Sequence, residues 1–111
     1  MKKVKAYYSG STYPGQQTKM DKNRFDVSIQ YEDDTWETVF SMNYEDFSGS
    51  LATEKKMKAF VILEHAKQRR PSEDEISALV AWPGHDLYRL TPRDIDQFFD
   101  EYSPQPTLFQ V

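Results

Sequence analysis

An uninterrupted alternation of apolar and polar side chains at residues 25–31 (FDVSIQY) constrains the fold of this chain more than any other feature. Period-two alternation is typical of a β-strand with one buried face, because successive side chains point to opposite sides of a strand. The buried face would consist of Phe25, Val27, Ile29 and Tyr31. We therefore expect a sheet that is covered on one side.

A second run, residues 35–42 (TWETVFSM), follows after a short acidic turn and predicts an antiparallel hairpin. The side chains expected to share one face of this strand are Trp36, Thr38, Phe40 and Met42. Residues 3–9 (KVKAYYS) offer a third, less regular strand. The polar, turn-rich residues between the third strand and the hairpin predict a long loop.

The first of three predicted helices begins after Thr53, which can serve as its N-cap, and covers residues 54–70. Pro71 would end it. Its apolar side would contain Ala59, Phe60, Leu63 and Ala66, with Lys58 and the other basic residues at other positions.

The second and third predicted helices carry clear start signals. Ser72 and Glu75 form the capping-box pattern of a short helix that would bury Ile76, Leu79 and Val80. In the third helix Thr91 is the expected N-cap and Pro92 the first helical residue. The apolar face of that helix would consist of Ile95, Phe98, Phe99 and Tyr102.

Strands come first along the chain and helices follow, and this segregation predicts an α+β fold. We expect a three-stranded antiparallel sheet followed by three helices packed on one face. A length of 111 residues suits a single core. We assign residues 1–103 to one domain and residues 104–111 to a C-terminal tail.

Cysteine is absent from the sequence, which excludes disulfides, thiolate nucleophiles and cysteine-based zinc sites. The lysines at the start of the chain are not followed by the apolar segment of a signal peptide, and no stretch is long enough to span a membrane. We expect a cytoplasmic protein that has no membrane partner.

The candidate catalytic side chains form no recognisable motif. His65 and His85 have no metal-binding partner at a known spacing. A serine or threonine nucleophile with His85 and Asp86 stays open, because triads assemble in space. The acidic clusters at residues 32–34 and 73–75 suit a turn and a helix start. We expect no enzyme, no metal site and no cofactor.

Charges of opposite sign alternate in blocks along the chain, with a net charge of −4. Residues 1–24 and 54–70 are basic, whereas residues 25–53 and 71–111 are acidic. The blocks can compensate one another in the fold, which is our expectation, or present faces of opposite sign to partners.

The C-terminal residues Gln105, Pro106, Thr107, Leu108 and Phe109 resemble the short linear motif by which many bacterial replication and repair proteins dock onto the DNA polymerase sliding clamp. In such a motif Leu108 and Phe109 would enter an apolar groove, and the Gln105 amide would form hydrogen bonds at its rim. The prolines favour an extended backbone, which lowers the entropy lost on docking. The alternative that Leu108 and Phe109 close the core of the domain stays open.

Three functional hypotheses follow. The first is a non-enzymatic protein-interaction factor that docks onto the sliding clamp through its tail. The alternative is an inhibitor from a phage or mobile element, of the anti-CRISPR or DNA-mimic type, that blocks a host nucleic-acid machine. The third is a nucleic-acid-binding module that uses the basic start of the chain, Tyr7, Tyr8, Tyr13 and residues 65–70 (HAKQRR). A pI near 5.1 and the acidic last helix disfavour direct binding of nucleic acid.

Overall fold

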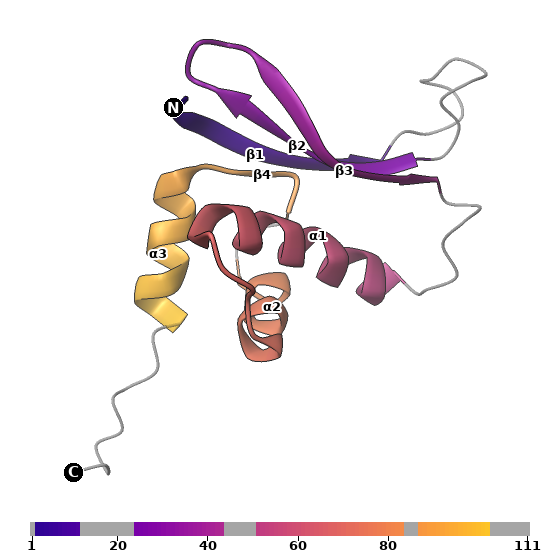
Figure 1. Cartoon of the computed structure of the whole chain (residues 1–111). Helices are drawn as coiled ribbons and strands as arrows, with labels where there is room; N and C mark the ends of the chain where they lie inside the picture. Colours follow the sequence, from indigo (N-terminus) through magenta and orange to yellow (C-terminus); the bar gives the residue numbers. More distant parts are fainter. Residues whose placement is uncertain (1, 12–23, 44–50, 84–86, 103–111) are drawn as a thin grey trace, which may run out of the picture.

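The computed structural model describes residues 2–11, 24–43, 51–83 and 87–102 (Figure 1). In the described part of the chain the sheet has four antiparallel strands in the order β3-β2-β1-β4. Their bounds are β1 Val4–Ser11, β2 Arg24–Tyr31, β3 Trp36–Asn43 and β4 Arg89–Leu90. The α+β class and the antiparallel sheet are confirmed, whereas the predicted number of three strands is wrong. The loop predicted between the first two strands falls mostly outside the described residues.

The fourth strand, β4, lies beside β1 although the two are distant in sequence. Tyr7 pairs with Leu90, and Tyr8 pairs with Arg89. Ser9 strengthens this edge, since its backbone N–H donates to the Tyr88 carbonyl at 3.0 Å. A strand of two residues has no visible period, so only the tertiary contact with β1 identifies it.

A β-bulge divides β3 and corrects the predicted face of that strand. Val27 pairs with Phe40 and Ser28 pairs with Thr38, which leaves Val39 without a partner in the register. An extra residue in one strand reverses the alternation beyond it. Phe40 therefore packs toward Phe25 on the helical side, whereas Trp36 and Thr38 lie on the outer side. The prediction of one shared face for Trp36, Thr38, Phe40 and Met42 is wrong.

The helices are α1 Leu51–Lys67, α2 Glu73–Val80 and α3 Pro92–Tyr102. Thr53 lies inside α1 and is not its N-cap. The helix ends three residues earlier than predicted, because Gln68 adopts a left-handed backbone with φ of 57°. At this end the Gln68 N–H donates to the Glu64 carbonyl at 2.9 Å.

Both short helices start as predicted. Ser72 Oγ accepts from the Glu75 N–H at 3.1 Å, and the Glu75 carboxylate accepts from the Ser72 N–H at 2.8 Å. Thr91 and Asp94 form the same reciprocal pair at the start of α3, with distances of 3.1 and 2.9 Å. Two capped starts satisfy backbone donors that would otherwise have no partner in the helix.

The core lies between the sheet and the helices. Figure 1 shows the helices below the sheet. Helix α1 contacts β2, α3 contacts β1 and β4, and α2 packs chiefly against α1. Direct packing of every helix on one sheet face stays a prediction for this reason. The core residues are Tyr7, Val27, Ile29, Ala59, Ile62, Leu63, Ile76, Leu79, Trp82, Leu87, Leu90, Ile95 and Phe98. Val80, predicted to be buried, is only partly buried.

Glu75, at the junction of α1 and α2, should make the stability of the fold depend on pH. Arg69 donates to both of its carboxylate oxygens, at 2.9 and 2.7 Å, and these bonds lower the pKa of Glu75 to about 2. A carboxyl whose pKa is lower in the folded state stabilises the fold above its unfolded pKa of about 4.3. That contribution is lost as the pH falls toward 2.

Glu75→Gln should lower the free energy of unfolding by about 1 kcal/mol at neutral pH, because Arg69 is half exposed and the ion pair is partly screened. The difference from wild type should shrink as acid protonates Glu75. Chemical denaturation at several pH values measures this difference in the free energy of unfolding. Glu73→Gln is the control, because Glu73 is exposed. A difference that stays constant down to strongly acidic pH would contradict this assignment.

Candidate binding groove

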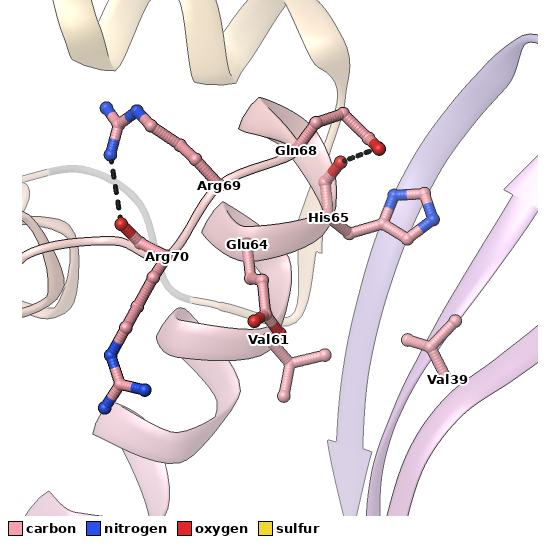
Figure 2. Close-up of a pocket in the computed structure, with 7 residues that line it drawn as sticks. All are labelled: Val39, Val61, Glu64, His65, Gln68, Arg69 and Arg70. Carbon is pink, nitrogen blue, oxygen red and sulfur yellow. Dashed lines mark hydrogen bonds between the residues drawn. The ribbon is translucent and has the colours of Figure 1, made fainter.

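A groove separates the C-terminal half of α1 from the neighbouring strands. It consists of two adjoining hollows of about 680 and 430 Å³, and His65 and Gln68 line both. The larger hollow is also lined by Lys2, Val4, Tyr7, Tyr31, Trp36, Glu37 and Ala66. The smaller one is also lined by Val39, Val61, Glu64, Arg69 and Arg70. Figure 2 shows the smaller hollow, with Val39 facing α1 from the sheet.

His65 occupies the middle of this groove and points from α1 toward the strands (Figure 2). Its ring meets the ring of Tyr7 edge-on, with centroids 5.8 Å apart. The Nδ1 atom of His65 is buried and has no hydrogen-bond partner among the described residues. Buried nitrogens normally have a partner, so His65 Nδ1 is an exception among the described residues.

Two tyrosines provide the polar part of the larger hollow. Burial raises the pKa of Tyr7, and the neighbouring Tyr31 raises it further. Tyr31 donates its hydroxyl to Glu37 Oε1 at 2.6 Å, a bond that raises the pKa of Tyr31. Both phenols therefore stay protonated at neutral pH. With the Glu37 carboxylate, they equip the groove to bind a polar ligand through hydrogen bonds.

The arginines at the end of α1 have partners within the chain. Arg69 pairs with Glu75, and the Arg70 guanidinium lies 5.4 Å from the centre of the Phe60 ring. Residues 65–70 were a candidate phosphate-binding run in the sequence. The structure gives each of these two arginines a contact within the fold instead.

The alternating charge blocks compensate one another in part. Lys2 lies 3.6 Å from Asp33, and Lys5 lies 3.4 Å from Asp34, which joins the first basic block to the first acidic block. Arg69 and Glu75 join the other two blocks in the same way. The expected internal compensation is thus present at these pairs, although exposed pairs contribute little stability.

The predicted site residues Gln105, Pro106, Thr107, Leu108 and Phe109 lie outside the described residues, as do His85 and Asp86. The domain boundary after residue 103 and the tail motif therefore stay predictions. Sequence reasoning missed the groove, because Tyr7, Tyr31 and His65 come from three different elements and no spacing links them.

Among the described residues, no cluster of three or more histidine, cysteine, aspartate or glutamate side chains could hold a metal ion. Within the same residues, every helix is too short or too polar to cross a membrane. Comparisons of the chain with protein-family models, with curated proteins and with solved structures gave no match.

Proposed function

We propose that this protein is a non-enzymatic interaction factor that docks onto a DNA polymerase sliding clamp through residues 105–109. The observation that carries the proposal is the spacing of one glutamine, two variable positions, leucine and phenylalanine in QPTLF. The two apolar side chains would supply most of the docking energy. Their burial gives on the order of 3 to 6 kcal/mol before ordering costs are subtracted.

The end of α3 supports the proposal because it is a fixed point close to the motif. Phe98 stacks on Tyr102 with centroids 5.5 Å apart, and Trp82 Nε1 donates to Glu101 Oε1 at 2.8 Å. Helix α3 ends at Tyr102, three residues before Gln105. A docking segment attached so closely to a packed helix would hold the folded domain near the clamp.

The double change Leu108→Ala, Phe109→Ala should abolish binding to a bacterial sliding clamp, measured by titration calorimetry. The melting temperature should stay within roughly two degrees of wild type, because a docking tail contributes no packing to the core. Thr107→Ala is the matched control, since it changes a variable position of the motif, and it should retain binding.

The opposite pattern would support the core-closing alternative. There the double change would lower the melting temperature markedly, because removing two buried side chains leaves cavities. Clamp affinity would be missing from the wild type as well. A wild-type chain without detectable clamp binding contradicts the proposed function, whatever the variants do.

A further inference from the structure

The most exposed large apolar side chains of the described residues gather on one face of the sheet. Trp36 is 55% exposed and Tyr88 is 62% exposed. Tyr8 lies between them, with ring centroids 5.0 Å from Trp36 and 5.9 Å from Tyr88. Tyr7 faces α1 through its contact with His65, so Tyr8 points to the opposite, outer face.

Two irregular features of the fold assemble this row. The bulge at Val39 places Trp36 on the outer face of an edge strand. The short strand β4 brings Tyr88 and Arg89 beside Tyr8, from which Arg89 is 81 residues distant in sequence. We call Tyr8, Trp36 and Tyr88, together with Arg89, the aromatic row.

Arg89 provides a positive charge at one end of the aromatic row. Its Nε donates to the Tyr8 hydroxyl at 2.9 Å, and its guanidinium carbon lies 5.7 Å from the centre of the Tyr8 ring. None of the ion pairs among the described residues involves Arg89. Arg89 is exposed, and Tyr8 holds its guanidinium in place. The guanidinium can therefore donate hydrogen bonds to an anionic group such as a phosphate.

The surroundings of the row are polar and open. Ser28 and Thr38 share the outer face with Tyr8, and their hydroxyl oxygens are 3.2 Å apart. Gly10, two residues beyond Tyr8 on the same face, has open space where a Cβ would lie. The centre of a protein-docking surface is normally apolar, whereas hydroxyl groups beside aromatic rings suit the edges of nucleobases.

From this arrangement we propose that the aromatic row binds single-stranded nucleic acid. Bases would stack on the rings of Trp36, Tyr8 and Tyr88, and a backbone phosphate would bind Arg89. A duplex does not fit, because its bases are already stacked on one another. Single-stranded DNA and RNA share the chemistry, and the test includes both.

The acidic net charge of the chain is compatible with this site. The described helices lie on the opposite side of the sheet from the row (Figure 1), and the acidic turn at Asp33 and Asp34 is paired with Lys2 and Lys5. Asp26 is the one carboxylate of β2, and it lies on the outer face beside Gly10. With one guanidinium in the row, few counterions would be released on binding. Affinity should therefore come mainly from stacking and should depend only weakly on salt.

The two tryptophans of the chain make a direct test possible. In the variant Trp82→Phe, Trp36 is the sole tryptophan, and a base stacked on its ring should quench its fluorescence. We expect short single-stranded DNA or RNA of mixed sequence to quench this emission, and a duplex of the same sequence to leave it nearly unchanged. Anisotropy of labelled oligonucleotides with the wild-type chain provides a second measurement that does not depend on the Trp82 change.

Trp36→Ala and Tyr88→Ala should each weaken binding on the order of tenfold, which is the scale of one lost stacking contact. Both side chains are exposed, so neither change opens a cavity. Trp36→Phe and Tyr88→Phe are the matched controls, and they should retain most of the affinity because they keep an aromatic ring. Arg89→Ala should weaken binding, and Arg89→Lys should restore it only in part.

Unchanged Trp36 emission with both single strands overturns the proposal. Binding that is insensitive to Trp36→Ala and Tyr88→Ala, or equal binding of duplex, also overturns it. The site is independent of clamp docking, so Leu108→Ala, Phe109→Ala should leave oligonucleotide binding intact. Failure of one proposal is therefore distinguishable from failure of the other.

Discussion

Ile29→Asp should abolish cooperative folding of the domain. Ile29 is fully buried in β2 and belongs to the cluster that joins the sheet to the helices. An unpaired carboxylate at this position costs several kcal/mol, against a total stability of about 5 to 15 kcal/mol for a domain of this kind. Loss of the thermal transition in circular dichroism would confirm the effect.

The neighbouring position provides the control for this experiment. Gln30 lies on the outer face of the same strand, so Gln30→Asp introduces the same charge without burying it. This variant should fold and melt near the wild-type temperature. A cooperative melt of Ile29→Asp at the wild-type temperature would mean that the buried face of β2 has been assigned incorrectly.

A second large effect is expected at the buried ion pair of α1. Lys58 Nζ lies 2.7 Å from Glu54 Oε2, and both side chains are almost completely covered. Lys58 also lies over the Phe25 ring, 5.8 Å from its centre. Lys58→Met should destabilise the domain by about 3 to 5 kcal/mol, because it removes the lysine charge from the covered ion pair with Glu54.

Denaturant titration of two further variants distinguishes the loss of stability caused by the missing charge from that caused by altered packing. Lys55→Met changes an exposed lysine of the same helix and should have little effect. The double change Glu54→Leu, Lys58→Met replaces the pair by apolar side chains and should recover much of the lost stability. A Lys58→Met effect no larger than that of Lys55→Met would show that the pair contributes nothing.

The parts of the fold that were predicted correctly rest on local chemistry. The alternation at Phe25, Val27 and Ile29 identifies a buried face because a strand has a fixed period of two. The capped starts at Ser72 and Thr91 are equally local, since each cap involves residues only three positions apart. Such patterns are visible before any tertiary contact forms.

The features that were missed depend on contacts between distant residues. The bulge at Val39 exists because of the register with β2, and β4 exists only through its pairing with β1. Lys58 was predicted to lie outside the apolar side of its helix, yet it is buried, and it contacts Glu54 and the Phe25 ring. A single sequence contains the residues of these contacts but not the register that brings them together.

The candidate sites also divide into one formed by consecutive residues and two assembled from distant elements. The tail motif is visible in sequence because five consecutive residues carry all of its chemistry. The groove at His65 and the aromatic row draw on several elements, so neither has a spacing that reasoning from sequence could detect. Tyr7 and Tyr8 were noted together as a possible stacking pair, but the sheet separates them onto opposite faces.

The bulge at Val39 also determines how mutations in β3 affect the two faces of the sheet. An insertion or deletion of one residue in β3 exchanges the side chains that the strand buries for those that it displays. The extra residue Val39 lies between Trp36 and Phe40 in the chain, and they reach opposite sides of the sheet because of it. Substitutions in β3 can therefore alter its two faces independently, whereas a change in strand length at Val39 alters both at once.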